Sequence, residues 1–320
     1  MGSVLAITLP IYLVMAVGYV ATRAGLFARA DMRVFGKYVI NLALPALLFN
    51  ALSSRSVGEV LEPVFVLAYT AGGLVAMGAG ILWARRAGKS LSAAATAGMG
   101  MSCPNSGFIG FPLVMQLFGA STAGVGLALA MVVENLLLLP LALAIADSDL
   151  GDAPPGSTRG QRLRAALWQS LRGIARNPMI HGIAFGFLFS LLGWRLPEPL
   201  ARAVNLFAVS TAAISLMVIG GSLVGIPARG MARDVSAVAI GKLLLHPLAV
   251  LALVWLLPPM QRELQVAVVV MAAVPMLGIY PILAQKHGHD GMAAAAQLGT
   301  TVASFFTLTA VLWLLQQLPV

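Results

Sequence analysis

The stretch GMGMSCPNSGFIGFPLVMQLFG, residues 98–119, combines a membrane-compatible composition with residues that interrupt helices. Pro104 and Pro112 each lack a backbone N–H, and each ring clashes with the preceding turn of a helix. Between the two prolines, the Asn-Ser-Gly triplet 105–107 favours turn conformations. The sequence therefore predicts two half-helices, with unwound backbone between Pro104 and Pro112.

The composition of the whole chain is that of a membrane protein. Its 320 residues are 59% hydrophobic and 10% charged, and the mean hydropathy is +0.92. A soluble domain carries about 25% charged residues. Most of this surface therefore faces something other than water, which predicts one polytopic membrane unit. Cys103 is the single cysteine, so an internal disulfide is excluded.

Ten apolar runs are long enough to cross a bilayer, which needs about 20 residues per helix. Helices are expected because the runs exceed the length of a barrel strand and do not alternate in polarity. The predicted spans are 3–22, 34–53, 62–84, 91–118, 121–146, 177–194, 200–224, 234–257, 263–285 and 291–317.

Lysine and arginine are distributed unevenly over the linkers between these spans. The odd-numbered linkers hold fifteen of them and the even-numbered linkers four, which predicts that the odd linkers are cytoplasmic and both termini lie outside. The net charge of +9 therefore indicates loop topology rather than a nucleic-acid partner. The fifth linker, 147–176, is the only long polar stretch, and it divides the chain into halves 1–146 and 177–320.

The two halves contain a weak internal repeat. Pro104 aligns with Pro275, and Gly107 with Gly278, at the same offset of 171 residues. Five spans per half would place the halves in opposite orientations. The alternative is a chance match, since proline and glycine are common in membrane helices. Paired interrupted segments in corresponding positions point to the binding site of a secondary transporter. We expect the breaks to cross near the midplane, where two half-helix N-termini would favour a carboxylate-sized anion.

Four stretches carry a family resemblance: NLALPALLFNAL (41–52), PNSGFIGFPLVMQLFG (104–119), NPMIHGIAFGFL (177–188) and VPMLGIYPILAQKHG (274–288). In these stretches the sequence resembles the auxin efflux carrier family of membrane permeases. The resemblance implies ten helices in two inverted five-helix repeats, with broken, crossing fourth and ninth helices, and a fold similar to the bile-acid sodium symporters. It also implies a scaffold domain, contributed by the first, second, sixth and seventh helices, and a transport domain. Bacterial members are associated with small carboxylates such as malate and malonate.

Candidate site residues follow from the same comparison. Pro104 and Asn105 match the first crossing of the family, and Pro275 and Pro281 match the second. Sodium-coupled relatives of this fold carry acidic and amide side chains in the ninth helix, and residues 268–284 carry none, which argues against such a sodium site. The substrate-binding candidates are Asn50, Pro104, Asn105, Ser106, Gly107, Pro275, Met276, Gly278 and Tyr280.

Several polar residues allow two interpretations. Glu134 is the only acid in the interior of a predicted span, away from its first residue. It and the adjacent Asn135 are candidates for ion or proton coupling; the alternative for Glu134 is a hydrogen-bonded structural role. Asn105 could contact substrate or cap the second half-helix. Tyr280 could close the cavity or pack. Lys242 is expected to extend to the cytoplasmic surface.

Enzyme activity is not expected, because Walker, zinc-ligand and HExxH patterns are missing from the sequence. We predict no cofactor and no metal. The leading hypothesis is a bacterial inner-membrane secondary carrier of a small organic anion, such as a mono- or dicarboxylate resembling malonate or malate. It would work by elevator-type alternating access, with a proton as candidate coupling ion and a homodimer formed through the scaffold. The alternative is a sensor or channel-like binder that uses the same crossing without transport.

Overall fold

The computed structural model describes residues 2–55, 61–148, 176–226 and 232–317. These residues are almost entirely helical, and no strand occurs among them, which confirms the predicted all-α class. Most of the predicted cytoplasmic loop 147–176 lies outside the described residues. The helices are α1 Gly2–Arg23, α2 Arg29–Tyr38, α3 Leu44–Ser53, α5 Pro63–Arg86, α6 Leu91–Ser102, α7 Phe111–Val133, α8 Leu139–Asp147, α10 Pro178–Leu192, α11 Glu198–Ser222, α12 Ala232–Ile240, α13 His246–Leu256, α14 Arg262–Ala273, α15 Tyr280–Gln285 and α16 Asp290–Gln317.

Seven helical runs in the described part are long and apolar enough to cross a membrane, which confirms a multi-pass membrane protein. One of them, Ser106–Asp147, has 42 residues but is not a single straight helix, because Gly119 lies at φ 81° and ψ 171°. The other six are Val4–Arg23, Arg29–Ser53, Pro63–Arg86, Glu198–Ser222, Ala232–Leu256 and Asp290–Gln317.

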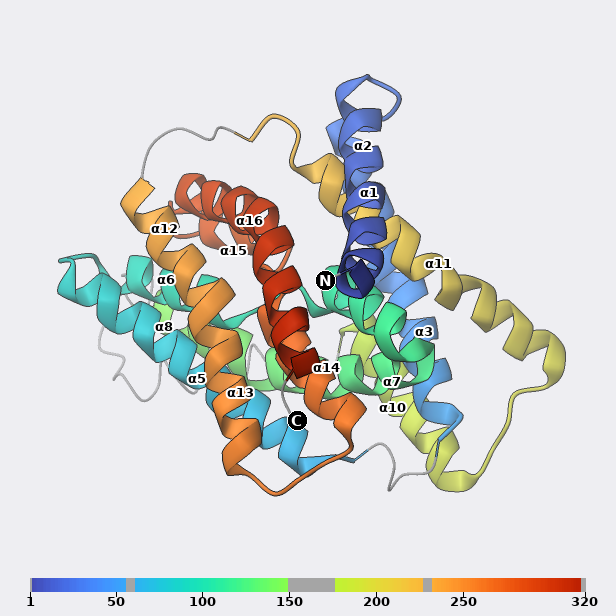
Figure 1. Ribbon diagram of the computed structural model, residues 1–320. Helices are drawn as coiled ribbons and strands as arrows, with labels where there is room; N and C mark the ends of the chain where they lie inside the picture. Colours follow the sequence, from blue (N-terminus) through green and yellow to red (C-terminus); the bar gives the residue numbers. More distant parts are fainter. Residues whose placement is uncertain (1, 56–60, 149–175, 227–231, 318–320) are drawn as a thin grey trace, which may run out of the picture.

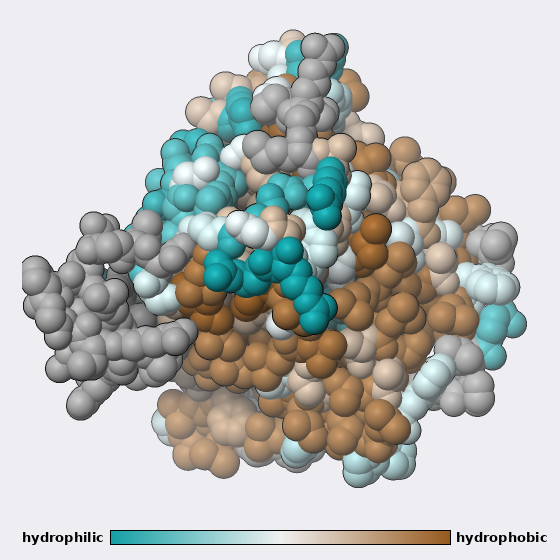
Figure 2. Space-filling model, turned by 90° about the vertical axis from the view of Figure 1, so that its left-hand side faces the viewer, coloured by the Kyte–Doolittle hydropathy of each residue, from teal (hydrophilic) through white to brown (hydrophobic). Residues whose placement is uncertain are grey.

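The outer surface has the character expected of a protein in contact with lipid. Large apolar side chains are turned outward on several helices: Leu206 is 71% exposed and Phe306 is 69% exposed. Figure 2 shows a broad hydrophobic surface next to a smaller hydrophilic area on the same face. In water, exposed apolar side chains of this size would oppose folding, whereas in a bilayer they contact lipid.

The helices pack in two groups (Figure 1). In one group α1 lies along α11, and α3 packs against both α10 and α11; in the other, α5 packs against α6 and α13, and α14 against α7, α13 and α16. Glycines allow the first group to pack closely. A Cβ on Gly18 of α1 would collide with the backbone of Met217, and one on Gly220 of α11 would collide with the backbone of Met15.

In the described ranges, four π-helical turns interrupt the α-helices, and each ends two residues before a proline. Proline lacks an N–H and its ring clashes with the carbonyl four residues earlier. A wider turn relieves this, because the residue before the proline then bonds five residues back, as the Phe111 N–H does to the Ser106 carbonyl. The turns are η1 Val39–Ala43 before Pro45, η2 Ser106–Gly110 before Pro112, η3 Glu134–Leu138 before Pro140 and η4 Gly241–Leu245 before Pro247.

The predicted interruption of the fourth span is present but narrower than expected. Helix α6 ends at Ser102, and Cys103 has extended backbone at φ −104° and ψ 98°. Helical structure resumes at Ser106, so the prediction that Ser106 and Gly107 form a turn is wrong, as is the prediction that Pro112 ends the unwound segment. The π turn accommodates Pro112 within a continuous helix.

The second interruption is longer. Helix α14 ends at Ala273, and the backbone is non-helical until α15 begins at Tyr280. Pro281 lies in the first turn of α15, where its missing N–H removes no helical hydrogen bond. Helix α15 has only six residues, so its N-terminus carries too little aligned dipole to bind an anion. The expectation of two converging half-helix N-termini is therefore not met in α15.

Candidate functional site

The two interrupted helices meet, and their extended segments bond to each other. The Asn105 N–H donates to the Pro275 carbonyl at 2.8 Å, and the Leu277 N–H donates to the Cys103 carbonyl at 3.0 Å. Pro104 and Met276 are paired in antiparallel fashion between these two bonds. Each break therefore supplies partners for backbone groups that the other has freed, and this is how unwound backbone can lie in an apolar core.

The front of this crossing, which faces α11 and α16, contains a side-chain amide that has no hydrogen-bond partner among the described residues. Asn105 is 5% exposed and makes no capping bond to the second half-helix, so the interpretation of Asn105 as a side-chain cap is wrong. Beside it, Gly278 is exposed. A Cβ on Gly278 would lie 3.6 Å from Asn105 Nδ2 and 3.4 Å from Ile219 Cδ1 of α11. The Asn105 amide therefore borders an open point that lies against α11.

The back of the crossing holds a buried cluster of oxygen atoms. The Tyr69 hydroxyl of α5 donates to Glu134 Oε1 at 2.5 Å and lies 3.1 Å from Ser106 Oγ. Ser106 Oγ donates to the same carboxylate oxygen. Tyr69 and Ser106 are fully buried, and Glu134 nearly so. Glu134 is thus held by two hydroxyl donors, one of them at the start of the second half-helix of the first break.

A buried lysine lies on the same side. Lys242 is 0% exposed, so the prediction that it reaches the cytoplasmic surface is wrong. Its Nζ donates to the Ala272 carbonyl at 2.6 Å and lies 3.0 Å from His246 Nδ1. Ala272 belongs to the last turn of α14, where helical carbonyls lack intrahelical partners and a cation is stabilised. Packing around α13 and α14 keeps the side chain inside.

His246 completes the cluster. An ammonium group can only donate, so with Lys242 charged His246 Nδ1 accepts and the ring proton lies on Nε2. Within the described residues, Nε2 is buried without a hydrogen-bond partner. The imidazole centroid lies 6.1 Å from that of the Tyr69 ring, which brings the lysine–histidine pair next to the oxygen cluster.

Three π turns contribute one polar residue each to the buried polar centre formed by the oxygen cluster and the lysine–histidine pair. These residues are Ser106 from η2, Glu134 from η3 and Lys242 from η4. A π turn shifts the angular position of its residues relative to an α-helix, and such turns often occur at functional sites. The prolines that follow these turns therefore act on the site indirectly, by setting which residues point toward the crossing.

Several predicted site residues lie elsewhere. Asn50 extends toward Asn205 of α11, with 3.5 Å between the two amides, and among the described residues its side chain makes no hydrogen bond to the crossing. Asn135 is adjacent to Glu134 in sequence but points away, since it donates to the Met131 carbonyl and accepts from Asn177 at 3.2 Å. The structure separates both residues from the polar centre.

Tyr280 packs rather than lining an opening. It is fully buried, and its hydroxyl donates to the Thr96 carbonyl of α6 at 3.0 Å. The ring is so close to Gly100 that a Cβ there would lie 2.7 Å from the hydroxyl oxygen. Tyr280 therefore fixes the start of α15 against α6.

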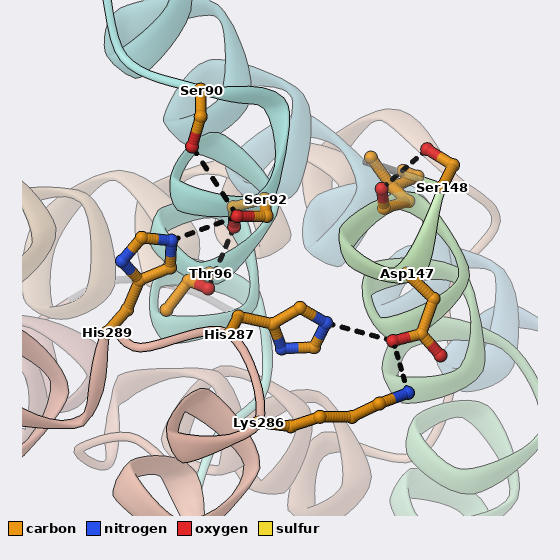
Figure 3. Close-up of polar contacts among 9 residues, drawn as sticks. Ser90, Ser92, Thr96, Asp147, Ser148, Lys286, His287 and His289 are labelled. Carbon is orange, nitrogen blue, oxygen red and sulfur yellow. Dashed lines mark hydrogen bonds and ion pairs between the residues drawn. The ribbon is translucent and has the colours of Figure 1, made fainter. Parts of the chain in front are cut away.

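Hydrogen bonds also connect the start of each broken helix to residues that follow the end of the other. Ser92 at the start of α6 lies 3.0 Å from His289 Nε2, next to the start of α16 (Figure 3). At the other end, the Thr122 hydroxyl donates to Glu263 at the start of α14 at 2.6 Å. Ser92 and Glu263 are 171 residues apart, the same offset that relates the two prolines of the crossing. The start of each broken helix is therefore hydrogen-bonded just beyond the end of the other, at equivalent positions in the two halves.

The turn between α15 and α16 makes further polar contacts. Asp147 Oδ1 at the end of α8 accepts from Lys286 Nζ at 2.7 Å and lies 2.9 Å from His287 Nε2 (Figure 3). Across the described ranges, no group of three or more His, Cys, Asp or Glu side chains could hold a metal ion. These contacts are hydrogen bonds and ion pairs of a helix–helix connection.

Apolar spanning helices around a buried polar crossing define a polytopic membrane protein with an internal site, and comparison with known proteins gives its family. The chain belongs to the membrane transport protein family, whose family model matches residues 3–314, and this confirms the resemblance to the auxin efflux carriers. It is 26% identical over 326 residues to the "Putative malonate transporter" of Rhizobium meliloti (strain 1021), covering 99% of this chain and 97% of that protein.

Two further relatives have transporter names. The "Uncharacterized transporter YfdV" of Escherichia coli (strain K12) is 24% identical over 313 residues, covering 96% of this chain and 95% of the relative. An "Uncharacterized transporter" of Methanothermobacter thermautotrophicus is 26% identical over 204 residues, covering 61% of this chain and 63% of the relative. The family and these names indicate a membrane transporter.

Sequence reasoning missed Tyr69 and the burial of Lys242. The available signal was the occurrence of isolated polar side chains within apolar runs, which are costly in lipid and so require partners. That signal was applied to Glu134 but not to Tyr69. Pairing these residues required the packing of α5, α7 and α13 around the crossing.

Proposed function

We propose that this protein is a secondary carrier of small carboxylate anions, and that substrate binds at the front of the crossing. The observation that carries this is the Asn105 amide, which has no hydrogen-bond partner among the described residues and is bordered by the exposed Gly278. A neutral amide and nearby backbone offer hydrogen bonds to a carboxylate without the strong binding of an arginine, which suits a site that must release its ligand.

We further propose that the described helices belong to ten spans in two inverted five-span repeats, 1–146 and 177–320. The packing supports this, because the first span lies on the seventh, α1 on α11, while the sixth lies on the second, α10 on α3. A two-fold relation between the halves exchanges these two contacts. Glycines with positive φ also occur in equivalent places: Gly25 and Gly193 after the first span of each half, and Gly119 and Gly288 after each broken span.

The two packing groups are proposed to be a scaffold, built from α1, α2, α3, α10 and α11, and a transport domain that contains the crossing. A polar contact between them is the Ser215 hydroxyl of α11, which donates to the Phe108 carbonyl of η2 at 3.2 Å. Helices α11 and η2 otherwise present mainly apolar side chains, and such surfaces can slide with little change in hydrogen bonding. An elevator movement would carry the crossing past α11. In the proposed orientation, both termini lie on the periplasmic side of the bacterial inner membrane.

Glu134 is the proposed coupling residue. It is a carboxyl group buried behind the substrate position, and Ser106 connects it to the crossing itself. A proton on Glu134 would change the hydrogen bonding of Ser106 and Tyr69, and so could link protonation to the state of the break. Asn135 is not proposed for this role, because it bonds away from the cluster.

Uptake into proteoliposomes tests the proposal. Purified protein would be supplied with labelled malonate, malate, acetate and an uncharged diamide of malonate, with and without an inward proton gradient. Malonate is included because a relative of similar length has a malonate transporter name. We expect saturable uptake of at least one carboxylate and none of the diamide. Binding of a carboxylate without any saturable flux would contradict the carrier and support a sensor.

A further inference from the structure

We infer that Gln297 of α16 contacts the substrate and, with Asn105, forms a pair of amide donors for one carboxylate group. Neither the family comparison nor the sequence motifs assigns a role to Gln297. The inference rests on the proposed carrier function and specifies how its site recognises the anion.

The geometry around Gly278 brings the two amides together. A Cβ on Gly278 would have three nearest groups: Ile219 Cδ1 at 3.4 Å, Asn105 Nδ2 at 3.6 Å and Gln297 Nε2 at 3.9 Å. The two nitrogen atoms therefore face the same point from different helices. That point is free because residue 278 is a glycine, and it is open because Gly278 is exposed.

Gln297 is held in place while it keeps a donor free. The side chain is 6% exposed, and Nε2 donates to the Gly278 carbonyl at 3.1 Å. A side-chain amide has two N–H groups, so the bond to Gly278 uses one and leaves the second. The anchored amide has lost most of its rotamer freedom before a ligand arrives, which lowers the entropy cost of binding.

These groups specify a class of ligand. A carboxylate has two oxygen atoms, and each can accept one of the two amide N–H groups. All three nearest groups at this point are uncharged, and the third is the methyl end of Ile219. The site therefore suits one carboxylate on a short aliphatic carbon, and any second charged group must extend away from Ile219.

A purely structural role is the competing explanation, since Gln297 could serve only to pair the Gly278 carbonyl. The two roles differ in what they change. Loss of a structural bond would reduce stability and maximal rate for every substrate alike. Loss of a substrate contact would raise KM and change the ranking of carboxylates.

The test uses Gln297→Met, which keeps the length of the side chain and removes its donors, and Gly278→Ala, which leaves Gln297 intact but fills the shared point. Gln265→Met is the matched control, because Gln265 is a buried glutamine on α14, 9% exposed, away from the break. Uptake of acetate, propionate, malonate and succinate would be measured in proteoliposomes, with thermal unfolding of each purified variant.

We expect Gln297→Met to raise KM for the preferred carboxylate about tenfold or more, with the maximal rate reduced less. Gly278→Ala should raise KM most for the bulkier carboxylates, and Gln265→Met should stay within about twofold of the wild type. Unchanged KM and ranking in both site variants would overturn the inference while the carrier function stands. Absence of carboxylate uptake by the wild-type protein would instead overturn the proposed function.

Discussion

Asn105 and Pro275, 170 residues apart, are joined by a backbone hydrogen bond of 2.8 Å at the point where two interrupted helices meet. Because Pro275 lies in the second break and Asn105 in the first, neither break could be buried without the other. The bond also fixes the Asn105 backbone and leaves its side chain unpaired, so the structural and proposed functional roles of this residue are carried by different atoms. This separation makes the site open to mutation without loss of the fold.

Asn105→Ala should remove substrate binding and leave the protein folded. The side chain makes no capping hydrogen bond, and the backbone bond to Pro275 does not depend on it. We expect carboxylate uptake to fall at least about tenfold, with thermal unfolding in detergent nearly unchanged. Asn41→Ala is the control, since that amide bonds only to the Lys37 carbonyl on an exposed surface. Full uptake by the Asn105 variant would rule out its amide as a substrate contact.

Glu134→Gln should separate transport from the proton gradient. Glutamine keeps the shape of the side chain and can accept hydrogen bonds from Ser106 and Tyr69, but it cannot exchange a proton. We expect residual uptake that no longer responds to an imposed pH difference. The measurement is uptake at equal and unequal pH on the two sides of the vesicle. A variant with the full pH response of the wild type would remove Glu134 from the coupling mechanism.

Lys242→Met should destabilise the protein, because it leaves the Ala272 carbonyl and His246 Nδ1 buried without a donor. Each unsatisfied buried group costs about 1–3 kcal/mol. Glu134 lies on the same side of the crossing, so the double variant Glu134→Gln/Lys242→Met should lose less stability than the sum of the single variants. Strictly additive losses of thermal stability would show that the two groups are independent.

Gly100→Ala should disturb the crossing through packing alone. The added methyl group would collide with the Tyr280 ring, whose hydroxyl bonds to α6, and overpacking of this kind costs about 1–3 kcal/mol. Gly78→Ala is the matched control, because its Cβ would meet nothing within 4 Å and alanine favours helix more than glycine does. Equal thermal stability of the two variants would contradict the close contact between Gly100 and Tyr280.

Pro112→Ala should reduce transport while leaving the chain helical. Alanine restores a backbone N–H, so the π turn of η2 can close to an α-helical turn and rotate Ser106 away from Glu134. Pro10→Ala is the control, since Pro10 lies within α1, away from the crossing. Circular dichroism and carboxylate uptake would be compared for both variants. Wild-type uptake by Pro112→Ala would show that the π turn does not position Ser106.

The family stretches could be read from the sequence, but the direction of single side chains could not. The family resemblance makes Asn50 a substrate-binding candidate, and the structure places its amide 3.5 Å from that of Asn205 of α11. Gln297 carried no signal, since a glutamine in a helix with several threonines is unremarkable until the carbonyl it bonds to is known. A polar side chain in an apolar run indicates that a hydrogen-bond partner exists, but it does not identify that partner.

The membrane class and the positions of the helix breaks follow from composition and from local residue properties. The membrane class follows from the composition, because so few charged residues cannot cover a water-facing surface. Pro104 and Pro275 marked the breaks, because a proline ring and its missing N–H disrupt a helix through local sterics alone. Tertiary structure decided which freed backbone groups bond, that Lys242 stays inside, and that Pro112 widens a helix instead of ending it. These outcomes depend on groups far apart in sequence that lie within bonding distance only after the helices have packed.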